Sequence, residues 1–227
     1  MTDRGERNFS HLPGFAARMY ALLTKTRAIQ LQHQEIAQRL ARQMQAGRLL
    51  DIGTGPGFLL REVYNLNRGI ELCGLDISDA MVALARKNLS DLHVDIRPGN
   101  IQKTEYEDGY FDLVTCTGSF YLWDEPVASL NEMYRILKPG CAAVLFESYR
   151  DYDEAALKQV LRQNLRQEPL LRRMISPFFL KKQLRMTYSV EETTRIIQQT
   201  CFAESFDIER VTIANLPVWM CITLRKP

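Results

Sequence analysis

Short apolar runs alternate with amphipathic segments over most of this chain, and the alternation is its strongest structural signal. The segments between the runs carry apolar residues three or four positions apart, which is typical of helices. Strands that alternate with helices in this way form a parallel sheet with helices on both faces. The runs that we predict to be strands are residues 48–52, 70–75, 92–97, 110–116 and 141–147.

The last part of the chain departs from this rhythm. Ser189 and Glu192 have the spacing of a capping box, which predicts a helix that runs to about Cys201. Two strand-like runs follow, Phe206–Thr212 and Val218–Leu224, and the short link between them suits a hairpin. The sequence therefore predicts a Rossmann-like α/β fold with a seven-stranded, mostly parallel sheet and an antiparallel last strand.

Capping residues and prolines mark the ends of the helices between the strands. Ser78 can cap a helix that runs to Asn88, and Asp124 followed by Pro126 can start a helix that reaches Leu137. We expect one apolar face on the second helix and a short turn that stops it before the fifth strand. The face consists of Val127, Leu130, Tyr134 and Leu137, and the turn of Lys138, Pro139 and Gly140.

Two segments lie outside the alternation. A helical pattern runs from about Phe15 to Ala46, with Ile36, Leu40 and Met44 four residues apart. Residues 149–188 include an amphipathic helix that the sheet does not require, and we expect this insertion to cover the site. Its apolar residues are Leu157, Val160, Leu161 and Leu165. We therefore predict a single domain with a helical arm at 1–47, a core at 48–148, a cap insertion at 149–188, and a C-terminal helix and hairpin at 189–227.

Composition narrows the class of protein. A chain of 227 residues with 46% hydrophobic and 25% charged residues is typical of one globular α/β domain. The first fifteen residues are charged where a signal peptide is apolar, and no stretch approaches the ~20 apolar residues of a membrane-spanning helix. We expect a cytoplasmic protein. The five cysteines lack paired C-x-x-C spacing, so we predict neither disulfides nor a metal site.

A glycine-rich loop follows the first predicted strand. Gly53, Gly55 and Gly57 alternate with other residues there, and glycine lets the backbone turn tightly and approach a ligand closely. The second strand ends at Asp76, whose carboxylate can accept hydrogen bonds from the two hydroxyls of a ribose. The sequence therefore predicts a ligand with an adenosine-like ribose at this edge of the sheet.

The spacing of the glycines distinguishes two classes of such ligand. The dinucleotide fingerprint G-x-G-x-x-G requires its third glycine where this chain has Phe58. It also places a diphosphate at the start of the following helix. The compact loop of this chain instead favours a ligand that ends in an amino acid.

Five motifs in order resemble the small-molecule branch of the class I S-adenosylmethionine-dependent methyltransferases, close to the type 11 and type 25 methyltransferase domains. They cover roughly residues 47–147 and, more loosely, the terminal hairpin. The motifs are Asp51 to Gly57, Asp76, Gly99-Asn100-Ile101, Phe111-Asp112-Leu113-Val114 and Leu137-Lys138-Pro139-Gly140. The resemblance implies S-adenosylmethionine as cofactor and S-adenosylhomocysteine as product.

The resemblance also implies roles for single residues. The backbone at Gly53 and Gly55 approaches the methionine part, Asp76 holds the ribose, and Asn100 stands where many relatives have an acid that receives the adenine amino group. Ile77 and Met81 flank the adenine, and Thr117 lies beneath the cofactor. The full set of implied cofactor-binding residues is Asp51, Gly53, Thr54, Gly55, Gly57, Asp76, Ile77, Met81, Asn100, Ile101 and Thr117.

Methyl transfer from a sulfonium depends mainly on alignment, so few catalytic residues are needed. A base near the carboxyl end of the fourth or fifth strand would help an acceptor that must lose a proton. Glu147 has that position and Tyr121 is the second candidate, while Tyr149 and His11 are weaker ones. For Glu147 a structural role, as a solvated strand end or as a member of an ion pair, is as well supported by the sequence as the catalytic role. Cys116 is expected to be buried strand packing.

The acceptor class stays open at this point. No Asn-Pro-Pro-Tyr string follows the fourth strand, which argues against amino groups of nucleic-acid bases. Residues 158–185 hold eight cations and one acid, which favours an acidic acceptor with an apolar body. The same charges could also contact anionic lipid or nucleic acid. Alternatively, they could simply form a solvated helix face. The functional prediction is methyl transfer to a small molecule. Its alternatives are a nucleic-acid methyltransferase, a nicotinamide-dependent oxidoreductase and a regulator that binds the cofactor without catalysis.

Overall fold

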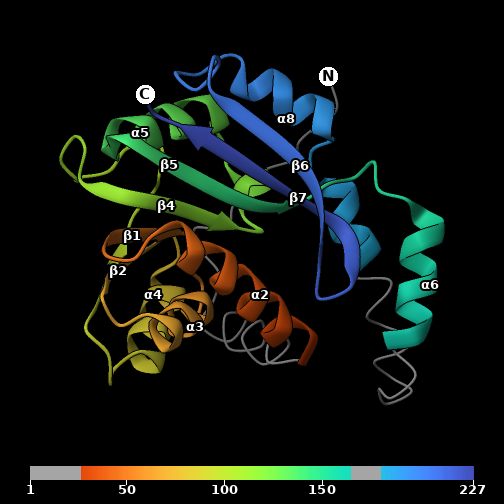
Figure 1. Ribbon diagram of the computed structural model, residues 1–227, viewed down its shortest axis with the longest axis horizontal. Helices are drawn as coiled ribbons and strands as arrows, with labels where there is room; N and C mark the ends of the chain where they lie inside the picture. Colours follow the sequence, from red (N-terminus) through yellow and green to blue (C-terminus); the bar gives the residue numbers. More distant parts are fainter. Residues whose placement is uncertain (1–26, 165–179) are drawn as a thin grey trace.

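A computed structural model describes residues 27–164 and 180–227 of the chain (Figure 1). Seven strands form one sheet in the order β3-β2-β1-β4-β5-β7-β6. Strands β1 to β5 are parallel to one another, whereas β7 is antiparallel to both of its neighbours. The predicted sheet and its antiparallel last strand are confirmed. The strands are β1 Gly47–Ile52, β2 Ile70–Asp76, β3 Val94–Pro98, β4 Phe111–Thr117, β5 Leu137–Ser148, β6 Phe206–Ile213 and β7 Leu216–Arg225.

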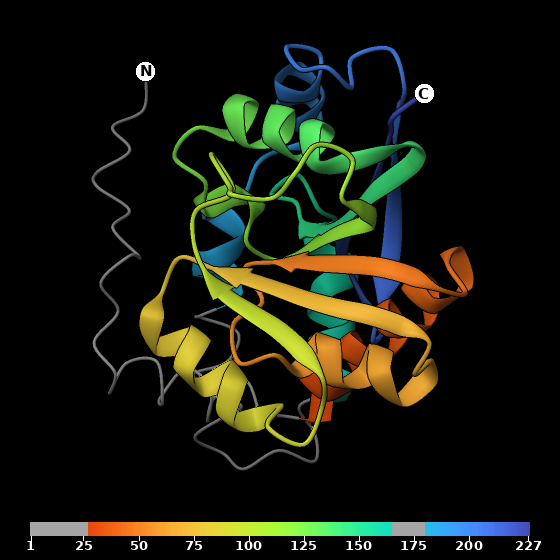
Figure 2. The same ribbon diagram turned by 90° about the vertical axis from the view of Figure 1, so that its left-hand side faces the viewer.

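Helices cover both faces of the sheet, as the two views show (Figures 1 and 2). One face packs against α5 and α8, and the other against α2, α3, α4 and α6. Because both faces are buried, the central strands carry continuous apolar runs rather than an alternating pattern. The helices are α2 Arg27–Gln43, α3 Phe58–Leu66, α4 Asp79–Asn88, α5 Pro126–Ile136, α6 Glu154–Asn164 and α8 Val190–Ile197, with a short 3-10 helix η2 at Phe120–Leu122.

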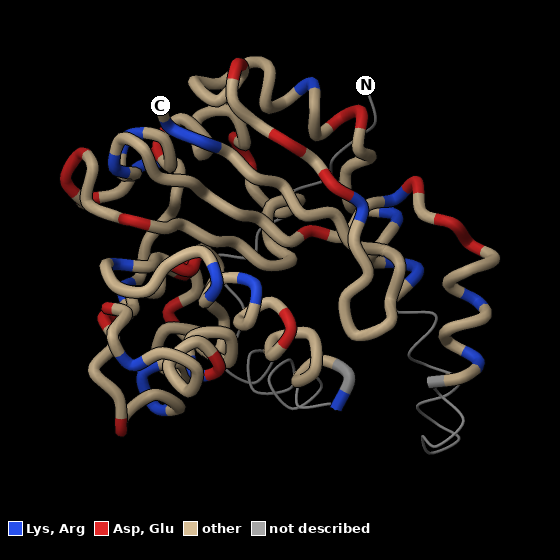
Figure 3. Tube along the Cα trace, viewed as in Figure 1, with Lys and Arg blue, Asp and Glu red and all other residues tan. Residues whose placement is uncertain are grey.

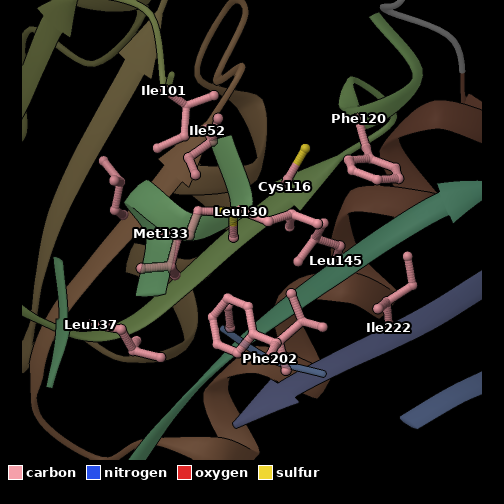
Figure 4. Close-up of a cluster of buried hydrophobic side chains, with 14 of the residues drawn as sticks. Ile52, Ile101, Cys116, Phe120, Leu130, Met133, Leu137, Leu145, Phe202 and Ile222 are labelled. Carbon is pink, nitrogen blue, oxygen red and sulfur yellow. The ribbon is translucent and has the colours of Figure 1, made fainter. Parts of the chain in front are cut away.

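The core beneath α5 shows how these elements pack together (Figure 4). Leu130 and Met133 of α5 are fully buried and lie in one cluster with Leu145 of β5. Ile136 is the next buried position on α5, whereas Tyr134 is only partly buried. The prediction of Tyr134 as a member of the buried face is therefore wrong by one residue. Met133, three positions after Leu130, takes the buried place.

Two of the predicted helix caps are present. The Ser78 hydroxyl accepts a hydrogen bond from the Met81 N–H at 3.5 Å. At α8 the Ser189 hydroxyl accepts from the Glu192 N–H at 3.1 Å, and the Glu192 carboxylate accepts from the Ser189 N–H at 2.9 Å. The capping box is confirmed, although α8 ends at Ile197 rather than near Cys201.

Helix α5 differs from the prediction at its start and at its end. The N-cap of α5 is Glu125, not Asp124, and its side chain makes no capping hydrogen bond. The predicted turn after the helix belongs to β5, which starts at Leu137 opposite Phe111. The strand register shifts before Ala142, so the proline and glycine of that segment lie in an irregular part of the strand.

The helical arm and the terminal hairpin meet at the edge of the sheet. The predicted arm is described only from Arg27 onward, where α2 packs its buried Ile36 and Leu40 against the core. The hairpin turn consists of Ala214 and Asn215, both with positive φ. The Ala214 N–H donates to the Glu35 carboxylate of α2 at 2.9 Å. The first helix and the last hairpin of the described chain are thus directly bonded.

The cap insertion is described in part. Helix α6 buries Leu157 and partly buries Val160 and Leu161, as its pattern predicts. A further helical stretch at residues 180–186 buries Leu184 beside it. The predicted cap residue Leu165 lies outside the described residues. Within residues 27–164 and 180–227, no helix is long and apolar enough to cross a membrane.

Candidate cofactor and acceptor site

The order of the strands reverses at β1, which pairs with β2 on one side and β4 on the other. The carboxyl ends of these strands meet where ligands bind in open α/β sheets. The loop after β1 starts there, and the backbone N–H groups of Gly53 and Thr54 both donate to the Leu75 carbonyl of β2 at 2.8 and 3.2 Å. The glycine loop and the acid after β2 are therefore brought together, as the sequence predicts.

The three glycines of this loop meet different surroundings, although all three have positive φ. A Cβ on Gly53 would collide with the side chain of Ser119, whose own Cβ would lie only 2.9 Å away. A Cβ on Gly57 would lie 2.7 Å from a methyl group of Leu89 in the helix layer. A Cβ on Gly55 would meet only a carbonyl oxygen at 4.0 Å. Of the three glycines, Gly55 therefore has the most open space on the side where a Cβ would lie.

Asp76 sits at the end of β2 and fixes both loops around it. One carboxylate oxygen accepts from the Gly55 N–H at 2.8 Å, and the other accepts from the Ser78 N–H at 2.9 Å. Burial of the carboxyl group raises its pKa, and the two N–H groups act in the opposite direction. A carboxylate oxygen has two lone pairs, so each oxygen can still accept a hydroxyl hydrogen of a ribose.

A second buried acid, Asp51, stands beside this site in β1. Its side chain is 2% exposed, and burial raises the pKa of its carboxyl group to about 7, with the charge of Asp76 acting in the same direction. Thr54 next to it is buried as well. Two acids within a buried site create a local preference for a cationic ligand.

The predicted adenine end has a mixed character. Ile77 is 44% exposed directly after Asp76, which is unusual for a large apolar side chain in this core. Met81 and Ile101 are buried. The Asn100 side chain is exposed, and its carbonyl oxygen already accepts from the Gln102 N–H at 2.9 Å. An adenine amino group would therefore have to share that oxygen.

Glu147 lies at the carboxyl end of β5 and is only 1% exposed. Its Oε1 atom accepts from the N–H groups of Ser119 and Phe120, both at 3.0 Å, and from the Cys116 thiol at 3.4 Å. Its Oε2 atom is buried and has no hydrogen-bond partner within residues 27–164 and 180–227. Burial raises the pKa of this carboxyl group to about 7. The alternative prediction, that Glu147 is a solvated strand end, is therefore wrong. The carboxyl group is enclosed and binds the backbone of the loop after β4.

The other acceptor-side candidates occupy different places. Tyr121 lies in η2 and is 8% exposed. The Thr117 hydroxyl at the end of β4 is buried and has no hydrogen-bond partner in the part of the chain that the structure describes. The Tyr149 hydroxyl donates to the Pro217 carbonyl over a long 3.5 Å, and Arg210 stacks on its ring. His11 lies outside the described residues.

Cys116 is fully buried, which confirms its predicted packing role. Burial raises the pKa of its thiol well above the ordinary value, and the nearby Glu147 carboxyl group acts in the same direction. A thiol of this kind stays protonated at neutral pH and is a poor nucleophile. The burial therefore argues against a covalent role for this cysteine.

Sequence reasoning missed Ser119. Its hydroxyl lies 3.0 Å from the Cys116 sulfur and 3.4 Å from the Ile52 carbonyl, and its side chain fills the space beside Gly53. The sequence offers a weak signal in the Gly118-Ser119 pair directly after an apolar strand. A contact across 66 positions of the chain depends on the sheet register, which no local pattern contains.

The basic cap is described only in part (Figure 3). Lys181 pairs with Glu154 at 2.6 Å, so one of the predicted cations is used within the cap. Four further cations of the segment are exposed, namely Lys158, Arg162, Lys182 and Arg185, and three lie outside the described residues, namely Arg166, Arg172 and Arg173. Among residues 27–164 and 180–227, no group of three or more His, Cys, Asp or Glu side chains is arranged to hold a metal ion.

Comparison with known proteins agrees with this geometry. A structure of a candidate S-adenosyl-L-methionine-dependent methyltransferase of Methanococcus maripaludis superposes with a TM-score of 0.74 at 22% identity, covering 100% of this chain and 97% of that one. The chain therefore shares the fold of that structure. Residues 50–145 match the family model described as "Methyltransferase domain".

Two curated relatives share the same core. A demethylmenaquinone methyltransferase of Deinococcus radiodurans is 34% identical over 102 residues, which cover 44% of this chain and 42% of that protein. The methyltransferase YdaC of Bacillus subtilis, whose acceptor its name leaves open, is 26% identical over 110 residues, which cover 48% of this chain and 61% of that protein. The matches thus span about half the length of these relatives.

Proposed function

We propose that this protein transfers a methyl group from S-adenosylmethionine to a small-molecule acceptor. The observation that carries the proposal is the Asp76 carboxylate, which ties the glycine loop to the start of α4 and keeps lone pairs for a ribose. The open side of Gly55 leaves room for the ligand beside that carboxylate.

The charge of the site residues supports the proposal. S-adenosylmethionine supplies an activated methyl group on a positively charged sulfur when it is bound. The buried acids Asp51 and Asp76 favour a cationic ligand over a neutral or anionic one. The exposed side chain of Ile77 offers an apolar surface to an adenine, with Met81 packed behind the same turn. Asn100 accepts the adenine amino group in this proposal, with Thr117 beneath the methionine part.

Glu147 is our candidate for the proton acceptor of the reaction. Its Oε1 atom is held by two backbone N–H groups, so its Oε2 atom keeps one orientation and has no competing partner among the described residues. A base works best when its pKa is near the working pH, and burial brings the pKa of this carboxyl group to about 7. Tyr121 of η2 is the second candidate on the same side of the sheet.

For the acceptor we propose an acidic group on an apolar body. The apolar part is supported by aromatic side chains beyond β4, where Phe120 contacts the rings of Trp123 and Tyr188. The acidic part is supported by the exposed cations of the cap, among them Lys158 and Lys182. One relative is named as a demethylmenaquinone methyltransferase, whose name indicates a quinone acceptor. Contact with anionic lipid and a cytoplasmic location stay predictions from the sequence.

Binding calorimetry tests the cofactor assignment. S-adenosylhomocysteine should bind the wild-type protein, and NADH should not. Asp76→Ala should weaken the binding of S-adenosylhomocysteine by about tenfold or more, because two hydrogen bonds to a charged group are lost. Asp95→Ala is the matched control, since this acid of β3 lies on the surface and pairs with Arg97. Binding of NADH alone, or equal affinity in the two variants, would contradict the proposal.

Product formation tests the transfer itself. We expect S-adenosylhomocysteine to accumulate when the protein is given S-adenosylmethionine and a panel of aromatic acids, quinols and phosphate esters. Glu147→Gln should keep cofactor affinity and lower turnover for acceptors that must lose a proton. A protein that binds the cofactor and turns over no member of a broad panel would favour the alternative of a non-catalytic regulator.

A further inference from the structure

The side chain of Ser119 occupies the junction between the glycine loop and the loop after β4. Its Oγ atom lies 3.4 Å from the Ile52 carbonyl, the last residue of β1 before the glycine loop. The same atom lies 3.0 Å from the Cys116 sulfur of β4. Ser119 therefore contacts both of the central strands whose carboxyl ends form the site.

The backbone around this serine has little freedom to move. Its N–H donates to Glu147 at 3.0 Å, and its carbonyl accepts from the Leu122 N–H at 2.9 Å. The preceding Gly118 N–H donates to the Phe146 carbonyl of β5 at 3.0 Å. Hydrogen bonds to β5 and η2 thus hold Ser119 on both sides, so its side chain keeps a fixed place relative to the sheet.

That fixed place coincides with the missing side chain of Gly53. A Cβ on Gly53 would collide with the Ser119 hydroxyl oxygen, and would lie 2.9 Å from the Ser119 Cβ. The serine therefore fills the volume that any other residue at position 53 would need. Gly53 is two residues from Gly55, whose N–H bonds to Asp76, so the serine side chain lies directly beside the start of the cofactor loop.

We propose that Ser119 is a positioning residue that couples the acceptor-side loop to the cofactor loop. Glu147 fixes the serine, the serine supports Gly53, and the loop from Gly53 to Gly55 presents its open side to the cofactor. The inference rests on the proposed function. It goes beyond it by assigning the alignment of the two halves of the site to one side-chain contact.

A first experiment measures the binding of S-adenosylhomocysteine by calorimetry. Ser119→Ala removes the hydroxyl and should weaken binding about three- to tenfold, as expected for the loss of one modest hydrogen bond. Ser119→Cys keeps a polar atom at the same place and should restore most of the affinity. Ser129→Ala is the matched control, since this serine is buried in α5 away from the loop, and its affinity should equal that of the wild type.

A second experiment exploits the complementary volumes. Gly53→Ala should weaken binding strongly, because alanine is strained at positive φ and collides with the serine. Removal of the serine side chain in Gly53→Ala/Ser119→Gly relieves the collision and leaves the strain. The double variant should therefore bind S-adenosylhomocysteine about tenfold more tightly than Gly53→Ala alone, although Ser119→Gly by itself weakens binding.

The outcomes separate this inference from the function on which it rests. If the wild-type protein does not bind S-adenosylhomocysteine, the proposed function fails. If the wild type binds it, and both Ser119→Ala and the double variant behave as though the two positions were independent, the coupling is wrong. Thermal unfolding by circular dichroism accompanies each variant. The positioning role would also be wrong if Ser119→Ala lost affinity only because it was partly unfolded, and if Ser119→Cys did not restore the affinity.

Discussion

The carboxylate of Asp76 accepts a hydrogen bond from the backbone N–H of Gly55 at 2.8 Å, so the acid that ends β2 holds the middle of the loop that follows β1. The other oxygen of the same carboxylate accepts from Ser78 at 2.9 Å, one residue before α4. A single side chain therefore sets the relative position of two loops that come from neighbouring strands.

Asp76→Asn should lower the free energy of unfolding by about 1–3 kcal/mol, because the amide nitrogen faces an N–H group and leaves it without an acceptor. Affinity for S-adenosylhomocysteine should fall in the same variant. Urea denaturation measures the first effect and calorimetry the second. Asp95→Asn on the exposed face of β3 serves as control. Wild-type stability in Asp76→Asn would show that the two N–H groups do not depend on this carboxylate.

Alanine at Gly55 and alanine at Gly57 should affect stability and cofactor binding differently. Gly55→Ala has free space around its new Cβ and should cost only the strain of positive φ, about 1 kcal/mol of stability, while it blocks the cofactor. Gly57→Ala pushes against Leu89 and should destabilise the fold by an additional 1–3 kcal/mol or so. Denaturation curves and cofactor titrations of the two variants check this. Equal losses of stability would contradict the assignment of the open side to Gly55.

The buried acids predict an unusual dependence of stability on pH. The pKa values of Asp51 and Glu147 are raised from 3.8 and 4.5 to about 7, so the folded state binds more protons than the unfolded state between about pH 4 and pH 7. The stability that these two groups contribute is therefore fully present below pH 4 and is lost as the pH rises through 7. Each pKa unit corresponds to about 1.4 kcal/mol.

Urea denaturation between pH 5 and pH 8 measures this effect. Asp51→Asn and Glu147→Gln should each flatten the decrease, because a neutral amide carries no charge to desolvate. At pH 8 each variant should match or exceed the stability of the wild type. The opposite result would be a free energy of unfolding that rises from pH 5 to pH 8 in the wild type and equally in both variants. It would show that these acids stay ionised in the fold.

Cysteine reactivity provides an independent check of the acceptor side. Iodoacetamide should modify the exposed Cys201 in the native protein and leave Cys116 intact, because the latter thiol is fully buried with a raised pKa. Peptide mass spectrometry after a timed reaction distinguishes the two sites. Rapid alkylation of Cys116, or turnover that depends strictly on its thiol, would revive a covalent mechanism at this position.

Much of the sheet follows from local pattern, because a strand buried on both faces must be apolar throughout. Strands β1, β2 and β4 begin and end within a residue or two of their predicted limits for this reason. The start of β5 was hidden by Pro139 and Gly140, whose turn chemistry conceals the pairing of Leu137 with Phe111. The cap of α5 was misplaced by one residue, because Asp124 and Glu125 are both acids before a proline.

The candidate site divides in the same way. The glycine loop and Asp76 lie at strand ends, where a local motif suffices to indicate them. The enclosure of Glu147 was not predictable, since a charged residue that ends a strand is usually solvated. The enclosure depends on backbone N–H groups that arrive from Ser119 and Phe120 on another strand's loop. The fit of Ser119 against Gly53 requires the register of two strands, which only the folded sheet supplies.

The bond between Glu35 and Ala214 joins segments that lie 179 positions apart. During synthesis the helix that carries Glu35 leaves the ribosome long before the hairpin that carries Ala214. Part of the core-facing side of this helix therefore stays uncovered until β6 and β7 have been synthesised. A nascent chain that stops short of the hairpin therefore lacks the hydrogen bond that joins α2 to the edge of the sheet.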